Sequence, residues 1–139
     1  MSSGIAVNPE CISLFQDLKL KHKIKYIVYK ISDDFKEIVV DKTSEDEDYE
    51  SFVAELPETD CRFAVYDFSY ETEDAGKRTK ICFYIWAPDN AKVKSKMLYS
   101  SSKDALKKAL NGIAVDIQGT DFSEVEHSYV LDKVSRGKY

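Results

Sequence analysis

Two stretches, CRFAVYDFSY at residues 61–70 and KICFYIW at residues 80–86, decide the fold of this 139-residue chain. Successive side chains of a strand point to opposite faces, and in the first stretch both faces carry bulky apolar groups. The second stretch is an almost unbroken apolar run. Strands of this kind are typical of the centre of a sheet that is covered on both sides. We therefore expect two central strands, joined by the polar turn 71–76.

Further strands are expected around this pair. The β-branched and aromatic run 26–31 and the run 37–41 indicate strands, and the Ser-Asp-Asp sequence between them supplies turn residues for a hairpin. Residues 113–117 follow Gly112 and are short enough for a last strand at an edge. The sheet is thus expected to hold four or five strands.

Helices are expected before, between and after these strands. Pro9 suits the first turn of a helix of about three turns, the acidic segment SEDED at 44–48 precedes a short helix, and residues 91–110 are expected to form a long one. The pair Thr-Asp at 120–121 can cap a closing helix. The buried face of that closing helix is expected to hold Phe122, Val125, Tyr129, Val130 and Val134.

This arrangement predicts an α/β (α+β) three-layer sandwich, in which helices cover both faces of a mixed central sheet of about five strands. The length fits one domain over residues 1–139. Residues 1–8 carry few features and are expected to be a short mobile N-terminus, and residues 136–139 are expected to fray.

The composition is that of an ordinary globular protein, with 43% hydrophobic and 32% charged residues. The chain has no apolar run near the roughly 18 residues that span a bilayer and no secretory signal pattern. We therefore expect an intracellular protein without integral membrane association. Cys11, Cys61 and Cys82 cannot all pair and match no zinc or redox spacing, so we expect buried, reduced thiols.

Positive charge is concentrated in the helix expected at 91–110, AKVKSKMLYSSSKDALKKAL, which holds six lysines and one aspartate in a chain of net charge −5. The segment 33–60 holds twelve acidic residues and two lysines, which argues against a general nucleic-acid-binding protein. Positive charge is therefore local, and it favours a negatively charged partner for this helix, although lysine-rich faces are also common on helices that bind nothing.

A helical wheel at about 100° per residue predicts how this helix is oriented. Four lysines fall on one edge, with Tyr99 among them, and are expected to face solvent as a stripe; they are Lys92, Lys96, Lys103 and Lys107. A small apolar face is expected to pack on the sheet; it holds Ala91, Leu98, Ser102, Ala105 and Ala109. Met97 lies nearer the boundary between the two.

Signals for catalysis are weak. His22 and His127 stand in no metal-ligand pattern and are interpreted as surface residues. The sequence has no glycine-rich phosphate loop, nucleophile elbow or metalloprotease helix. We expect no enzymatic activity, no cofactor and no metal.

Five motifs together resemble the ADF/cofilin family of actin-binding proteins. They are YDF at 66–68, GKRTKI at 76–81, WAPD at 86–89, KSKMLYSSSKD at 94–104 and IQGTD at 117–121. The resemblance runs from Ser3 to about Arg136, with the motifs in family order and at family spacing. It implies an ADF-homology, gelsolin-like fold. It also implies a monomeric protein of the cytoplasm and actin cytoskeleton that binds actin monomers and filaments, prefers ADP-bound actin, severs filaments and promotes depolymerisation.

The resemblance also assigns sites. The surface for actin monomers and filaments would comprise Ser3, Gly4, Ile5, Lys94, Lys96, Met97, Lys103, Asp104, Lys107 and Lys108. A filament-specific patch would add Arg78, Lys80, Asp132, Lys133 and Arg136. Taken without the family, Arg78 and Lys80 could instead simply protect a strand edge.

Regulation is implied in the same way. Ser3 matches the family's regulatory phosphoserine, and a phosphate there would repel an acidic partner. The lysines could bind phosphoinositide head groups in competition with actin. Two departures stand out: Val115 replaces the histidine to which some members' pH sensitivity is ascribed, and DDFK at 33–36 replaces the basic nuclear-import cluster of vertebrate members. We therefore expect nuclear entry only by diffusion or together with actin.

Two alternatives differ in function. One is a relative of the same fold that binds filaments without severing them or that regulates branching. The other is a module that binds phosphoinositide membranes or nucleic acid through the lysine stripe, which the acidic half of the chain disfavours.

Overall fold

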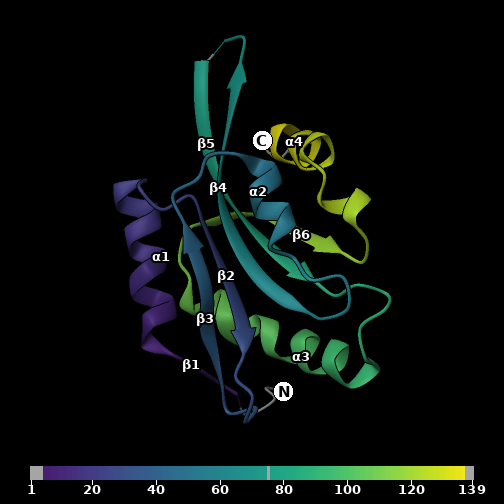
Figure 1. Cartoon of the computed structure of the whole chain (residues 1–139). Coiled ribbons are helices and arrows are strands. Elements are labelled where there is room, and N and C mark those ends of the chain that lie inside the picture. Colours follow the sequence, from purple (N-terminus) through teal and green to yellow (C-terminus); the bar gives the residue numbers. More distant parts are fainter. Residues whose placement is uncertain (1–4, 75, 137–139) are drawn as a thin grey trace.

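The structure, a computed structural model, describes residues 5–74 and 76–136 and is built on one mixed six-stranded sheet (Figure 1). The strand order is β1-β3-β2-β4-β5-β6, in which β1–β3 and β5–β6 are parallel pairs and the others are antiparallel. The strands are β1 (Ala6–Val7), β2 (Tyr26–Ile31), β3 (Glu37–Ser44), β4 (Arg62–Thr72), β5 (Gly76–Trp86) and β6 (Ile113–Gly119).

Helices cover both faces of the sheet, as the sequence predicts. The first face is covered by α1 (Pro9–Lys21) and α3 (Val93–Ala109), and the second by α2 (Tyr49–Ala54), the 3-10 helix η1 (Phe122–Val125) and α4 (His127–Arg136). The three-layer α+β architecture and the central position of β4 and β5 are confirmed. Within the described residues, no helix has both the length and the apolar character needed to cross a membrane.

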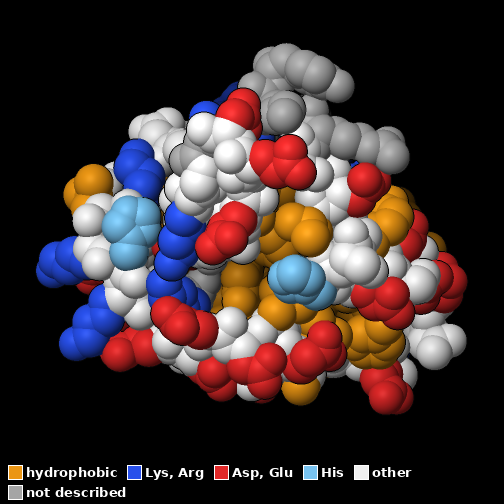
Figure 2. All heavy atoms as spheres, turned by 90° about the horizontal axis from the view of Figure 1, so that it is seen from above, with side chains coloured by type: hydrophobic (Ala, Val, Ile, Leu, Met, Phe, Trp, Pro, Cys, Tyr) orange, Lys and Arg blue, Asp and Glu red, His pale blue; other side chains and the backbone are white. Residues whose placement is uncertain are grey.

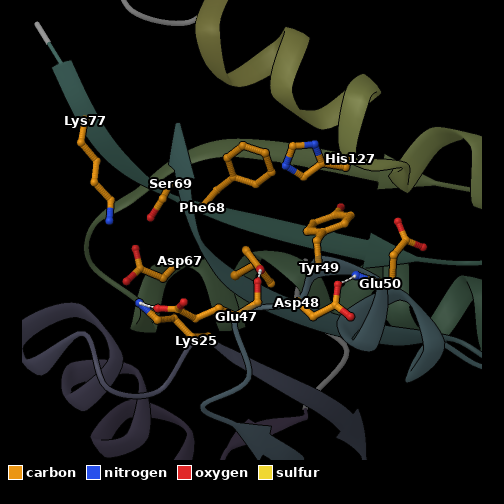
Figure 3. Close-up of a pocket in the computed structure, with 11 residues that line it drawn as sticks. Lys25, Glu47, Asp48, Tyr49, Glu50, Asp67, Phe68, Ser69, Lys77 and His127 are labelled. Atoms are coloured by element: carbon orange, nitrogen blue, oxygen red, sulfur yellow. Dashed lines mark hydrogen bonds and ion pairs between the residues drawn. The ribbon is translucent and has the colours of Figure 1, made fainter. Parts of the chain in front are cut away.

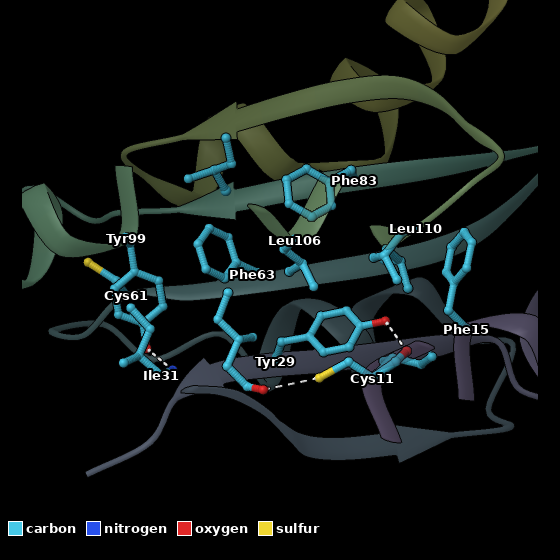
Figure 4. Close-up of a cluster of buried hydrophobic side chains, with 14 of the residues drawn as sticks. Cys11, Phe15, Tyr29, Ile31, Cys61, Phe63, Phe83, Tyr99, Leu106 and Leu110 are labelled. Carbon is cyan, nitrogen blue, oxygen red and sulfur yellow. Dashed lines mark hydrogen bonds between the residues drawn. The ribbon is translucent and has the colours of Figure 1, made fainter. Parts of the chain in front are cut away.

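Strand β4 separates two buried clusters. Phe63 and Val65 belong to the cluster under α1 and α3, which Figure 4 shows, whereas Ala64 and Tyr66 belong to the cluster under α2 and α4. Each fully buried large apolar side chain stabilises the fold by about 1.5–3 kcal/mol. Burial on both sides therefore explains why the sequence of this strand carries bulky apolar side chains on both faces.

Helix starts follow the expected cap chemistry. The Asn8 side chain accepts a hydrogen bond from the Glu10 amide at the start of α1, and Asp48 accepts one from the Glu50 amide at the start of α2. Helix α1 is followed by the capping residue His22, which adopts a left-handed φ of 56°. The His22 ring is exposed, and its Nδ1 lies 3.0 Å from Oδ2 of the buried Asp67.

The N-terminal expectation is wrong where the structure describes it. Residues 5–8 are expected to be mobile, yet Ile5 is buried and β1 adds a sixth strand parallel to β3. The amides of Ala6 and Asn8 donate hydrogen bonds to the carbonyls of Lys36 and Ile38. A two-residue strand has too little sequence for a pattern, which explains why it is missed.

The closing helix also differs from the expectation. The Asp121 side chain accepts from the Ser123 amide and caps the short η1 rather than a long helix, and Glu126 in extended conformation separates η1 from α4. The expected apolar face is thus divided. Val125, Val130 and Val134 are buried, while Phe122 and Tyr129 are partly exposed. The last helix runs to Arg136, so the expected fraying does not begin there; residues 137–139 lie outside the described part.

The three thiols are free and buried, and burial raises the pKa of Cys11 and Cys82 to about 12 and that of Cys61 to about 11. Because the thiolate is the reactive form, we expect no reaction of the native protein with a thiol reagent such as DTNB at pH 8. All three should react once guanidinium chloride unfolds the chain. A thiol of the native protein that reacts as fast as free cysteine would contradict this burial.

Candidate functional site

Helix α3 is fixed to the sheet by Tyr99. Its hydroxyl oxygen accepts a hydrogen bond from the Ile31 amide at 3.0 Å, and its ring centroid lies 5.0 Å from that of Phe63 (Figure 4). Ser102 and Leu106 complete the buried side of the helix. This side determines which residues of α3 face solvent.

The predicted orientation of the lysine stripe is wrong. Tyr99 was expected among outward-facing lysines but lies in the core, and the packing face is turned from the small residues toward Tyr99 and Leu106. The lysines beside it are therefore brought to the margin of the helix–sheet contact: Lys96, Lys103 and Lys107 are half-buried and Lys92 is exposed. The helical wheel groups Tyr99 with the lysines, so it assigns this side of the helix to solvent although the Tyr99 ring packs in the core.

Two of these lysines bind groups of the same molecule. The Lys96 ammonium donates to the Asp89 carbonyl at 3.0 Å, and the Lys107 ammonium pairs with the Asp116 carboxylate on β6. Part of the predicted cationic surface is thereby engaged within the protein. Lys94 and Lys108 are exposed.

The solvent-facing side of α3, which we term the outer strip, holds both charge and apolar surface. Val93 and Met97 are 69% and 68% exposed, and they line a shallow groove with Lys94, Leu98 and Ser101. Leu98 is half-buried and packs against the core, as expected. The outer strip comprises Val93, Lys94, Met97, Ser101, Asp104 and Lys108.

Phe35 extends this surface and is absent from the sequence prediction. It lies in the β2–β3 turn at a φ of 59° with its ring 58% exposed, and the Lys94 ammonium lies 5.8 Å from the ring centroid. A large aromatic residue in a turn is the signal that could have found it, since exposed aromatic residues are enriched where proteins bind each other.

The N-terminal residues of the expected site divide into two groups. Ser3 and Gly4 lie outside the described residues. Ile5 is buried in the core beside β3, so its side chain is not available to a partner. The assignment of Ile5 to the actin surface stays a prediction.

The expected filament-specific residues lie around the other end of the sheet. Beyond Ile81, β4 and β5 continue as a two-stranded ribbon that projects from the body (Figure 1) and carries the exposed Arg78. The Lys80 ammonium donates to the Val134 carbonyl at 3.1 Å, which joins this ribbon to α4. On α4, Asp132 and Lys133 are exposed, and Arg136 ends the helix with a side chain outside the described part.

Nothing in the described residues forms a group of His, Cys, Asp or Glu side chains that could hold a metal ion. The outer strip itself offers contact area and charge, which suit protein recognition. It combines exposed apolar side chains, flanking ammonium groups and a rigid helix.

The family model of Cofilin/tropomyosin-type actin-binding proteins matches residues 4–135. The chain belongs to the cofilin/ADF family. The cofilin of Mycosarcoma maydis is 60% identical over 139 residues, which is 100% of both chains. Among solved structures, the crystal structure titled Streptomyces griseoflavus cofilin has 55% identity and a TM-score of 0.91, covering 96% of this chain and 99% of that one. Actin depolymerization factor 2 of Plasmodium berghei has 35% identity and a TM-score of 0.87, covering 97% and 99%.

Membership confirms the resemblance seen in the sequence. Cofilin/ADF proteins form a non-enzymatic, actin-binding and actin-depolymerising family, and the mixed sheet with four α-helices is that of the cofilin structures. The outer strip, and the ribbon together with α4, are therefore the candidate surfaces for a protein partner of this cofilin-family chain.

Replacing Tyr99 by Phe should test how α3 is held. The change removes only the hydroxyl and leaves the buried Ile31 amide without its acceptor, so we expect a loss of about 1–3 kcal/mol in the free energy of unfolding. Chemical denaturation measures it. Tyr129→Phe on α4, where the side chain is partly exposed, is the matched control and should change stability little. Equal stability of the two variants would show that the Tyr99 hydroxyl does not anchor the helix.

Proposed function

We propose that this protein binds actin monomers and filaments, with a preference for ADP-bound actin, and severs filaments and speeds their depolymerisation. It acts as a single-domain monomer in the cytoplasm, on the actin cytoskeleton. The observation that carries the proposal is the outer strip of α3, which belongs to a chain of the cofilin/ADF family and joins exposed apolar side chains to ammonium groups.

Charged and apolar side chains of the outer strip would play different parts in binding actin. Actin is acidic, so Lys94 and Lys108 would speed the encounter by long-range attraction. Met97 and Val93 would supply contact that loses water on binding, as the centre of an interface requires. Two lysines of the predicted surface, Lys96 and Lys107, hold internal contacts and would contribute mainly by orienting the helix.

A second surface would contact filaments only. Arg78 and Lys80 on the ribbon and Asp132, Lys133 and Arg136 on α4 form it in this proposal. The Lys80 contact to Val134 supports the idea that ribbon and helix move as one body. Helices α3 and α4 cover opposite faces of the sheet. One molecule could therefore bind two neighbouring actin subunits of a filament, one through each surface, and alter the contact between those subunits.

The paired change Lys94→Ala with Met97→Ala should weaken binding to filaments at least tenfold, since truncating central interface residues costs about 2 kcal/mol or more. Co-sedimentation with filaments measures the affinity. The matched control is Leu20→Ala with Lys21→Ala, which removes an exposed leucine and a lysine from α1. Wild-type binding by the first variant, with its fold intact, would overturn the assignment of the outer strip.

Severing is separated from its alternatives by imaging single filaments over a series of protein concentrations. Breaks along filaments are expected from the proposal. Bound but uncut filaments would favour the non-severing or branch-regulating relative. An absence of any effect on actin, together with salt-sensitive binding to anionic vesicles or oligonucleotides, would favour the surface-binding module.

Phosphorylation of Ser3 would switch actin binding off, because a phosphate adds about −1.5 to −2 of charge beside an acidic partner. Phosphoinositide head groups would compete with actin for the exposed ammonium groups of α3. We expect Ser3→Glu to bind actin monomers more weakly than the wild type, and Ser3→Ala to bind them equally well. Fluorescence titration of labelled monomers measures both. Equal affinity of the Glu and Ala variants would count against regulation by charge at this position.

A further inference from the structure

A second concave site lies on the sheet face opposite α3. Its volume is about 450 Å³, within the range of small-ligand clefts, and it lies between the start of α2, strand β4 and the start of α4 (Figure 3). It contains none of the residues that we assign to actin. Its lining residues are Lys25, Glu47, Asp48, Tyr49, Glu50, Tyr66, Asp67, Phe68, Ser69, Lys77 and His127.

The pocket contains an incompletely paired carboxylate. Asp67 is only 3% exposed. Its Oδ2 lies 3.0 Å from Nδ1 of His22, but its Oδ1 is buried without a hydrogen-bond partner. A buried carboxylate oxygen that lacks a donor costs free energy. In Figure 3 the carboxylate lies on the pocket wall near Ser69 and Lys77, so a molecule in the pocket could supply a donor to this covered oxygen once the exposed Lys77 side chain moves aside.

The opposite end of the pocket is aromatic. The His127 ring stacks on Phe68 at 5.1 Å and meets Tyr49 edge-on at 5.3 Å, while Tyr49 and Tyr66 lie 5.0 Å apart. The rings come from β4, α2 and α4 and are packed into one wall. Phe68 and Tyr49 are buried and the His127 ring is exposed, so this end of the pocket offers an apolar surface to a ligand.

The rim is predominantly acidic. Glu47 is 83% exposed and lies 3.8 Å from the Lys25 ammonium, and Asp48 and Glu50 stand beside it on the same stretch of chain. Figure 2 looks onto this end of the molecule and shows apolar side chains in a hollow with acidic groups gathered along its margin. The exposed side chains of Glu47 and Lys77 can move aside for a ligand. Four carboxylates against two lysines favour a cationic ligand.

We propose that this pocket receives the side chain of an arginine from a partner protein. A guanidinium group is planar and permanently charged, stacks on aromatic rings and donates several hydrogen bonds to carboxylates. It would donate to the orphaned Oδ1 of Asp67 while the apolar stem of the arginine lies along the aromatic end of the pocket, where the His127 ring is exposed. A metal ion fits less well, because no metal-holding group occurs among the described side chains.

The first test is a titration of the ¹⁵N-labelled full chain with N-acetyl-arginine methylamide, followed by NMR. We expect shifts of the amides of Tyr49, Asp67, Phe68 and Ser69, and none from the citrulline analogue, which is neutral and has nearly the same shape. Equal shifts with citrulline, or shifts confined to other acidic surfaces, would overturn the proposal. Tighter binding of the lysine analogue would overturn the choice of arginine.

Variants locate the interaction. Asp67→Asn should weaken arginine binding about tenfold or more, because a hydrogen bond to a charged group is lost. Since this residue is buried and could affect folding, Glu47→Gln on the exposed rim is the second variant and should weaken binding severalfold without loss of stability. Glu58→Gln, outside the pocket, is the matched control and should bind as the wild type does. Unchanged affinity in Glu47→Gln and in folded Asp67→Asn would exclude the site, and the actin assays described above would be unaffected by that result.

Discussion

Burial of the β4–β5 pair on both faces is the constraint on which the structure depends. Phe63 and Phe83 face α1 and α3, while Tyr66 and Tyr84 face α2 and α4. Neither face can meet water without a large loss of hydrophobic free energy, so both helical layers are required. The outer strip of α3 and the outward side of α4, which we assign to actin, lie on those layers. Their placement is therefore a consequence of how the core is covered.

Much of this architecture could be predicted from the sequence because the signals are local and strong. Strand β4 carries bulky apolar residues on both of its faces. Helix α1 begins at Pro9, directly after the capping residue Asn8. Strand β1 could not be predicted, since its two residues carry no pattern of their own and its pairing with β3 is a tertiary contact. The break between η1 and α4 was also hidden, because Asp121 is as good a cap for a 3-10 turn as for a long helix.

The site was predicted less completely than the fold. In a helix rich in Lys, Ser and Ala, a helical wheel does not decide which side packs on the sheet. The wheel therefore assigns the aromatic Tyr99 to the solvent side of α3, which is wrong. Its hydrogen bond to the Ile31 amide is a tertiary contact between residues 68 positions apart, which periodicity does not report. Phe35 was missed for a related reason, as its proximity to Lys94 exists only once the turn and the helix are brought together. The family motifs place the proposed actin surface on this same helix, and that assignment stays a prediction.

The parallel pairing of β1 with β3 bears on the order in which the molecule assembles. Strands β4 and β5 are joined by a short turn and can pair early, because little chain must be closed into a loop. Strand β1 has no template until β2 and β3 have formed, and it then pairs with β3 over two residues, Ala6 and Val7. The N-terminal strand is thus the last element to dock and the first to open, so its amides would exchange with solvent hydrogen far sooner than those of β4.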